Sequence, residues 1–379
     1  MKRIVSCESV TAGHPDKVCD QISDSVLDAL LREDPLSRAA VECTASPDFV
    51  HVMGEVTTKA NIDYEQEARK AIRRAGWTED EYLFTDRTPV VVSIHSQSPD
   101  IARGVDSAAS IGAGDQGIMF GYATDETEEG LPLAHVLARK LTQKLTDARE
   151  DGSIPFLRPD GKSQVSVEYD EGKIRRIDTI VLSAQHDEDI EIGQLREVLH
   201  SKVISQVIPD SLIDRDTKFF INPTGRFVLG GPAADTGLTG RKIIADTYSG
   251  YAPHGGGAFS GKDPTKVDRS ASYLARNIAL TIVKSGAAKQ ALVQLAWAIG
   301  ISHPVSIFAD TFSTCRIPDD RLADWITDNW DLTPKGIIDE FDLRRPIYAD
   351  TARFGHFATG QSWEAVSPDR TASLLRLLN

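Results

Sequence analysis

The sequence has few of the features that mark membrane-spanning, secreted or zinc-stabilised proteins. Only four of its 379 residues are cysteine and none forms a CxxC pair, which disfavours a structural zinc site and a disulfide framework. No apolar run reaches the ~18 residues that span a bilayer. Polar and acidic residues interrupt the first stretch at once, so it does not resemble a signal peptide. We therefore expect a cytoplasmic protein without a membrane partner.

Positive charge is also scarce over most of the chain. Lys and Arg number 42 against 56 Asp and Glu, which gives a formal net charge of −14. Nucleic acids and anionic membrane surfaces attract basic proteins, so we expect neither as a general partner. Hydrophobic residues make up 41%, the share of an ordinary globular protein with enough apolar mass for sizeable cores.

One segment reverses this charge balance. Between Lys218 and Lys284 there are nine Lys and Arg, four Asp, no Glu, and ten of the 28 glycines. A basic, glycine-rich segment suits a phosphate-rich small ligand, because glycine lets backbone N–H groups approach the phosphates. A loop-rich segment with solvated Lys and Arg explains the same composition equally well.

Three segments share a glycine-bearing turn followed by an amphipathic helical pattern. They open at 13–15, at 130–132 and at 261–264. Proline fits the first helical turn, since its missing N–H costs no hydrogen bond there. In the third segment we expect Asp263 as the N-cap and Pro264 as the first helical residue. Three similar α/β units would fit the length of the chain.

Strand patterns lie between these helices, and one pair flanks the hairpin signal Asp170-Glu171-Gly172. Hairpins mixed with helices predict an α+β fold, with mixed or antiparallel sheets and helices on one face. We expect domains over residues 1–99, 112–229 and 230–379, with 96–110 as a long polar loop that acts as a lid. The predicted strands cover 50–58, 90–95, 118–122, 164–169, 173–183, 218–221, 227–229 and 242–247.

Two glycine patterns carry limited weight by themselves. Gly256–Lys262 matches seven positions of the phosphate-binding GxxxxGK loop, but the eighth, Ser or Thr in a P-loop, is Asp263. A phosphate cradle of another kind and a glycine-rich surface turn both remain open. Gly112–Gly117 matches the GxGxxG dinucleotide pattern, yet a polar loop precedes it and a strand pattern follows, so a Rossmann interpretation is set aside.

Several carboxylates are ambiguous when each is considered alone. His14 and Asp16 lie at a predicted helix start, where free N–H groups and the helix dipole favour an anion. His14 could contact a phosphate, and Asp16 could bind Mg²⁺, which takes one or two carboxylates plus phosphate oxygens. Asp16 could equally just complement the dipole, and Asp268 is similarly open. Glu42 and Glu55 flank or lie in predicted strands, where a carboxylate is less expected.

Taken together, the motifs closely resemble the bacterial type of the S-adenosylmethionine synthetase (methionine adenosyltransferase) family, from about Glu8 to about Gly355. The resemblance implies three interleaved α/β domains in a pseudo-threefold arrangement. It also implies active sites between two subunits, hence at least a homodimer and often a dimer of dimers. ATP and L-methionine would give S-adenosylmethionine, phosphate and diphosphate, with two Mg²⁺ per site and an activating K⁺. The matching stretches are 8–17, 112–123, 219–227, 237–242 and 254–264.

The same resemblance implies which side chains handle the triphosphate and the metals. Asp16 and Asp268 would hold Mg²⁺, and Glu42 would help to bind K⁺. Asp115 is a further catalytic candidate. The side chains expected to grip the phosphates are His14, Lys162, Arg241, Lys242 and Lys262.

For the nucleotide and methionine, the resemblance implies two further groups of residues. Residues 97–107 correspond to the mobile gating loop of the family, in agreement with the lid expected above. Residues around the nucleotide are Asp160, Gly161, Arg226, Phe227, Asp235 and Ala258, with Phe227 facing the adenine. Residues around methionine are Glu55, Gln97, Asp235 and Lys266.

Two other functions stay open on the residues alone. An ATP- or polyphosphate-cleaving hydrolase could use the same phosphate site, and so could a nucleotide-binding protein without catalysis. Neither needs a methionine pocket, so the presence of Glu55, Gln97 and Lys266 favours the synthetase.

Overall fold

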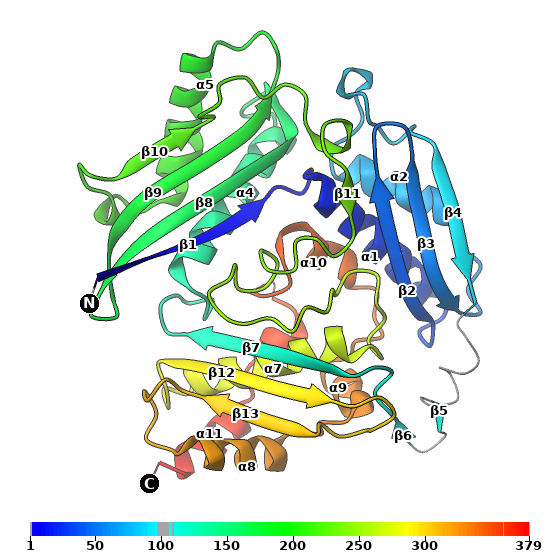
Figure 1. Cartoon of the computed structure of the whole chain (residues 1–379), viewed down its shortest axis with the longest axis vertical. Coiled ribbons are helices and arrows are strands. Elements are labelled where there is room, and N and C mark those ends of the chain that lie inside the picture. Colours follow the sequence, from blue (N-terminus) through cyan, green and yellow to red (C-terminus); the bar gives the residue numbers. More distant parts are fainter. Residues whose placement is uncertain (1, 97–105, 108–109, 359, 379) are drawn as a thin grey trace.

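The computed structural model describes residues 2–96, 106–107, 110–358 and 360–378. Within them the chain builds three sheets of three or four strands, and helices cover one face of each (Figure 1). The predicted α+β fold with mixed and antiparallel sheets is confirmed. Most of the predicted lid over 96–110, Gln97 included, lies outside the described residues, apart from the short paired strands β5 (Asp106–Ser107) and β6 (Ser110–Ile111).

The first sheet is mixed and has the strand order β11-β2-β3-β4. Strand β3 pairs antiparallel with β2 and parallel with β4. Helix α1 packs on β2 and α2 packs beside α1 and β4. The bounds are α1 (Pro15–Glu33), β2 (Arg38–Ala45), β3 (Val50–Thr57), α2 (Tyr64–Arg74), η1 (Asp80–Tyr82), β4 (Val90–His95) and β11 (Gly237–Leu238).

The second sheet has the order β1-β8-β9-β10, and helix α4 packs on β8 and β1. Strands β8 and β9 form the predicted hairpin, whose turn places Glu171 and Gly172 at positive φ. The bounds are β1 (Lys2–Val10), α4 (Leu133–Glu150), β8 (Leu157–Asp170), β9 (Lys173–His186), α5 (Ile192–Leu199), the π-helix η2 (His200–Ile204), α6 (Ser205–Val207), η3 (Asp210–Leu212) and β10 (Lys218–Ile221).

The third sheet is antiparallel with the order β13-β12-β7, and helix α7 packs on β7 and β12. Five short helical segments follow this sheet along the chain. The bounds are β7 (Gly117–Thr124), η4 (Gly231–Ala233), α7 (Val267–Lys284), β12 (Gln290–Trp297), β13 (Ser306–Asp310), α8 (Asp319–Asn329), α9 (Pro334–Phe341), α10 (Tyr348–Phe354), η5 (Ser362–Glu364) and α11 (Pro368–Arg376).

Each sheet takes one strand from a distant part of the sequence. Strand β1, at the start of the chain, pairs with β8; β7 pairs with β12; and β11 pairs with β2 (Figure 1). The sheets are therefore interleaved along the chain rather than built from consecutive segments. The exact domain limits 1–99, 112–229 and 230–379 stay a prediction.

Two hydrophobic cores stabilise this arrangement. One lies between the second sheet and α4, whereas the other is shared by the first and third sheets and by α1 and α7. The four cysteines are free, which confirms that the fold uses no disulfide. Among the described residues, no helix is long and apolar enough to cross a bilayer.

Helix α1 differs from the predicted amphipathic helix because it is buried on almost every side. Its apolar residues, such as Val18 and Ile22, are fully buried as expected, but Lys17, Asp20 and Asp24 are at most 1% exposed. A buried charge is costly unless it is paired. The partners of these charges therefore decide how the rest of the chain folds around α1.

Three local predictions were wrong for identifiable reasons. Residues 227–229 and 242–247 form no strand; in the second, Asp246 N–H donates to the Lys242 carbonyl and closes a turn. Helix α7 begins at Val267, and its N-cap is Lys266 rather than Asp263. Asp263 is occupied elsewhere, because its carboxylate accepts from Ala39 N–H and pairs with the Lys266 ammonium.

Candidate active site

The N-terminus of α1 is the centre of the candidate site. Gly13 packs so closely on Pro159 of β8 that a Cβ there would lie 2.4 Å from the proline Cβ, so only glycine allows this approach. His14 is the N-cap of α1 and is 1% exposed. Its Nδ1 accepts a hydrogen bond from the backbone N–H of Asp16 at 3.2 Å. Because Nδ1 accepts, the neutral ring carries its proton on Nε2 and can donate from there.

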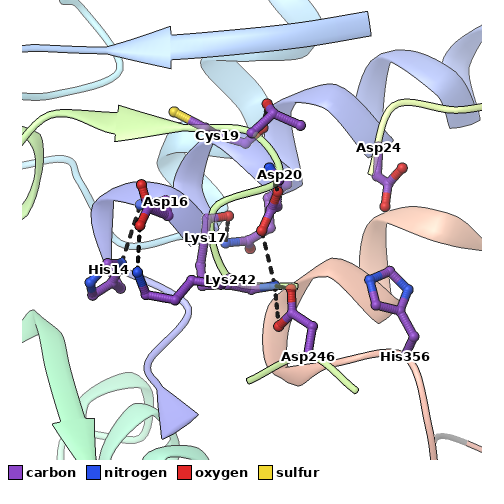
Figure 2. A network of polar contacts seen from close by, with 12 residues as sticks. His14, Asp16, Lys17, Cys19, Asp20, Asp24, Lys242, Asp246 and His356 are labelled. Atoms are coloured by element: carbon purple, nitrogen blue, oxygen red, sulfur yellow. Dashed lines mark hydrogen bonds and ion pairs between the residues drawn. The ribbon is translucent and has the colours of Figure 1, made fainter. Parts of the chain in front are cut away.

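Two cationic side chains converge on this helix end. In the segment after β11, Lys242 Nζ lies 2.6 Å and Arg241 Nε 3.6 Å from the Asp16 carboxylate. Asp16 Oδ1 also accepts a hydrogen bond from Leu238 N–H at 3.0 Å. This bond holds β11, the strand immediately before this segment, against the start of α1. Figure 2 shows His14, Asp16 and Lys242 grouped at the start of α1.

Burial and neighbouring cations act on the pKa of His14 in the same direction. Burial, followed by the charges of Lys242, Lys162, Lys17 and Arg241, lowers it to about 2. The imidazole is therefore neutral at any physiological pH. The cations Lys162, Arg241 and Lys242 close to a neutral donor form a site suited to phosphate oxygens.

Strand β8 adds the next part of the site. Asp160 Oδ2 accepts from Gly231 N–H at 2.9 Å, and Gly161 carbonyl accepts from Thr11 N–H. Burial raises the pKa of Asp160 to about 6, and Asp235 adds to the rise. The Asp160 Oδ1 is buried and finds no hydrogen-bond partner within the described part of the chain, so it is available to a donor on a ligand.

The predicted nucleotide residues at 226–235 lie beside Asp160. The Phe227 carbonyl accepts from His186 N–H, and Phe227 N–H donates to Nε2 of the His186 ring. The phenyl ring reaches the backbone at Gly230. Arg226 is turned outward and forms an exposed ion pair with Glu188. The phenyl ring is thus near Asp160, whereas the guanidinium of Arg226 is held at the surface.

Lys262 and Asp268 form a second charged pair, with Lys262 Nζ 2.7 Å from Asp268 Oδ2. Gly257 packs against Asp268, since a Cβ at this glycine would lie 2.3 Å from the carboxylate carbon. Ala258, the next residue, contacts the segment that carries Arg241 and Lys242, because its Cβ is 2.6 Å from the Cβ position of Gly240. The glycine-rich loop and the segment carrying Arg241 and Lys242 are therefore in contact.

Of the predicted methionine and potassium residues, Glu55 and Glu42 lie in strands of the first sheet. Lys262 forms a β-bridge with Ala40 of β2, and Ala40 pairs with Glu55 of β3. Glu55 and Glu42 are both exposed. Lys266 Nζ contacts Asp263 at 2.5 Å. Glu55 is therefore one strand away from the bridge of Lys262, and Gln97 lies outside the described residues.

Asp115 is the least integrated of the predicted residues. It is exposed, and its Oδ1 accepts from the adjacent Gln116 N–H. Two residues later, the Cβ position of Gly117 lies 3.3 Å from Asp268 Oδ1, so Asp115 is close in sequence to the second charged pair. No described contact ties its side chain to His14 or Lys262, and its catalytic role stays a prediction.

Comparison with known proteins decides the family. The chain matches the models for the N-terminal, central and C-terminal domains of S-adenosylmethionine synthetase over residues 2–99, 110–227 and 229–365. It is 52% identical over 397 aligned positions, covering all of both chains, to the S-adenosylmethionine synthase of Pseudothermotoga lettingae. The chain belongs to the S-adenosylmethionine synthetase family. This confirms the resemblance found in its motifs.

The synthetase fold brings together charged residues that the motif comparison did not single out. Lys17 is fully buried and lies between Asp246 and Asp20, 2.7 Å from both oxygens of Asp246 and 3.2 Å from Asp20 (Figure 2). Trp77 Nε1 donates to the Gly13 carbonyl at 3.0 Å. The sequence held one signal for Asp20, since aspartate recurs every fourth residue from Asp16 to Asp28, but no local pattern identifies its partners.

The donor set of the candidate site fits Mg²⁺ only together with a substrate. Across the described residues there is no group of three His, Cys, Asp or Glu side chains that could hold a metal alone. Asp16 and Asp268 each provide one carboxylate, and Mg²⁺ takes one or two carboxylates plus phosphate oxygens. Each carboxylate touches a lysine, Lys242 or Lys262, that also suits phosphate.

The raised pKa of Asp160 predicts a pH-dependent stability difference. The folded carboxyl keeps its proton up to about pH 6, whereas an unfolded Asp loses it near pH 3.8, so this group lowers stability as pH rises through that window. Asp160→Asn keeps an acceptor for Gly231 N–H and never ionises. Its free energy of unfolding should exceed that of the wild type by about 2–3 kcal/mol at pH 7.5. This difference in the free energy of unfolding should nearly vanish at pH 4, as denaturant titrations at both pH values would show. A difference that does not change with pH would contradict the raised pKa of Asp160.

Proposed function

We propose that the site at the N-terminus of α1 joins the adenosyl group of ATP to the sulfur of L-methionine, the reaction implied by its family. The chain is a methionine adenosyltransferase, hence a transferase that makes S-adenosylmethionine. The observation that carries the proposal is the convergence of Lys162, Arg241 and Lys242 on the neutral His14. This arrangement is suited to the three phosphates of ATP.

The chemistry explains why the site is rich in cations and needs no base for its first step. The methionine thioether attacks the 5′ carbon of ATP, a C–S bond forms, and the C–O bond breaks with its electron pair going to tripolyphosphate. No proton leaves the sulfur. The main barrier is charge growing on the leaving group, and preorganised donors in a closed site lower it. We assign His14 Nε2–H to the bridging oxygen, with Lys162, Arg241 and Lys242 on the other phosphate oxygens.

Lys262, at the end of the glycine-rich loop, adds a further cation to this phosphate site. The same side chains hold tripolyphosphate while it is hydrolysed to phosphate and diphosphate. Asp16 and Asp268 are the proposed holders of two Mg²⁺ ions. These ions, when bound, neutralise phosphate charge and assist attack on the tripolyphosphate. Glu42, exposed on β2, is the proposed K⁺ ligand.

Asp160, Gly161 and Phe227 are the proposed contacts of the nucleoside, with the unpaired Asp160 Oδ1 as an acceptor and the Phe227 ring on the adenine. The polar ends of methionine are assigned to the outer residues. Glu55 and Asp235 suit its ammonium group, and Lys266 suits its carboxylate. Gln97, Arg226, Ala258 and Asp115 complete the proposed site on the resemblance alone.

A second copy of the chain is the proposed partner, as a homodimer and then a dimer of dimers. Glu42 and Glu55 are exposed on the open side of the first sheet, which a catalytic pocket has to cover. Strands of all three sheets also carry large exposed apolar side chains, as interaction surfaces do. These are Ile4, Val91, Val92, Ile118, Phe220 and Phe308.

A product assay tests the proposed reaction. With ATP, L-methionine, Mg²⁺ and K⁺, the protein should form S-adenosylmethionine together with equal amounts of phosphate and diphosphate. Omitting methionine should abolish nearly all phosphate release. Equal phosphate release without methionine would favour a hydrolase, and ATP binding without any turnover would favour a nucleotide-binding protein; either result would contradict the proposed reaction.

Asp16→Asn separates a metal-binding role from a folding role. Asp16 is buried and ion-paired, so it does more than complement the helix dipole, but Asn keeps an acceptor for Leu238 N–H. We expect turnover to fall at least ~100-fold, while the free energy of unfolding changes by no more than about 2 kcal/mol. Asp320→Asn is the matched control, since it alters an exposed first-turn carboxylate of α8 and should change neither quantity. Steady-state kinetics and denaturant unfolding measure both; parallel losses of turnover and fold would argue against a metal role.

A further inference from the structure

Helix α1 carries four aspartates at intervals of four residues, so they lie one turn apart along the same side. Each accepts a backbone N–H from the part of the chain after residue 237, and all four are at most 7% exposed. The pairs are Asp16 with Leu238, Asp20 with Gly240, Asp24 with Gly261, and Asp28 with Tyr348 and Ala349. We call these contacts the aspartate ladder.

The second contact of the ladder holds the segment that carries Arg241 and Lys242. Asp20 Oδ1 accepts from Gly240 N–H at 2.9 Å, and its Oδ2 lies 3.2 Å from Lys17 Nζ. Lys17 in turn binds both oxygens of Asp246, whose own N–H donates to the Lys242 carbonyl. The segment from 240 to 246 is therefore anchored to α1 at both ends, with its two cationic residues between the anchors.

The third contact holds the other charged pair of the site. Asp24 accepts from Gly261 N–H at 2.8 Å and forms a two-oxygen ion pair with the fully buried Arg269, at 2.7 and 2.8 Å. Arg269 also donates to the Lys262 carbonyl at 3.1 Å, and it directly follows Asp268 in α7. Lys262 and Asp268 are thereby fixed relative to the same helix as His14.

We propose that Asp20 and Asp24 are positioning residues for adenosyl transfer, which set the phosphate-gripping side chains against His14. Asp20 fixes the positions of Arg241 and Lys242, and Asp24 fixes the positions of Lys262 and Asp268. The proposal rests on the proposed function of this site. Because Asp20 and Asp24 are buried behind the loops, they act through Gly240 and Gly261 rather than by touching ATP. A misplacement of about 1 Å in such a site can cost ~100-fold in rate.

The ladder also supplies its own control. Asp28 makes the same kind of contact on the same helix, but its partners, Tyr348 and Ala349, carry no candidate site residue. Asp28→Ala and Asp20→Ala should therefore both lower the unfolding temperature, since each leaves buried N–H groups without an acceptor. Only Asp20→Ala should also disturb the phosphate site.

Three measurements on the full-length protein test the proposal. We expect kcat of Asp20→Ala to fall ~100-fold with KM for methionine changed less than about threefold, since Glu55 and Lys266 are untouched. Asp20→Asn, which keeps an acceptor for Gly240 N–H, should recover kcat to within about tenfold of wild type. Asp28→Ala should keep a wild-type kcat below its unfolding temperature. Equal kcat losses in Asp20→Ala and Asp28→Ala, or no rescue by Asn, would overturn the positioning role.

A binding measurement keeps this test separate from that of the proposed reaction. Calorimetry with inorganic tripolyphosphate and Mg²⁺ should show at least ~10-fold weaker binding by Asp20→Ala and unchanged binding by Asp28→Ala. This binding result does not depend on whether the wild type makes S-adenosylmethionine. Absence of that product would contradict the proposed function but not the positioning role. Should Asp20→Ala not fold, Asp20→Glu keeps the charge beside Lys17 but displaces Gly240 by one methylene. It should show the same loss of binding, and wild-type binding would overturn the proposal.

Discussion

The structure depends on the pairing of charges along a helix that is buried on nearly all sides. Asp16, Lys17, Asp20, Asp24 and Asp28 all lie in α1 with at most 7% exposure. An unpaired charge in such a place would cost several kcal/mol, more than a domain can spare from its net stability. Apart from the local contact between Lys17 and Asp20, their partners come from segments more than 200 residues later, so the late part of the chain must close onto α1 for the protein to fold. That closure also assembles the candidate active site.

Interleaving of the sheets supplies the remaining side chains. Strand β1 leads directly into the turn before α1 and pairs with β8, so Val10 lies opposite Lys162 and Gly13 lies against Pro159. Strand β11 pairs with β2, and the bridge between Ala40 and Lys262 joins the glycine-rich loop to the same sheet. The proposed phosphate-binding residues thus come from segments joined to the first and second sheets, which could not be separated without dismantling the candidate site. These sheets meet at the buried N-terminus of α1.

Sequence patterns predicted the parts of this design that are local. Helical periodicity placed α1 and α4, and the hairpin signal at 170–172 placed β8 and β9, because short-range spacing determines these elements. Strands were wrongly expected at 227–229 and 242–247, because Phe227 N–H donates to the His186 ring and Asp246 N–H donates to the Lys242 carbonyl within its own turn. The start of α7 was predicted at Pro264, but Asp263 accepts a hydrogen bond from Ala39 N–H of β2 instead of capping the helix. Long-range pairing of this kind has no local pattern, so the burial of Lys17 and the roles of Asp20 and Asp246 emerge only in three dimensions.

Amide hydrogen exchange on the wild-type protein measures the central claim most directly, namely that α1 holds the cationic loops in place. The Leu238, Gly240 and Gly261 amides lie outside helices, yet each donates to a buried carboxylate. Ser153 N–H provides the comparison, since it donates to the carboxylate of Asp151 in an exposed turn. We predict that the three loop amides exchange as slowly as those in the middle of α1, and much more slowly than Ser153. Exchange at the rate of Ser153 would contradict the account.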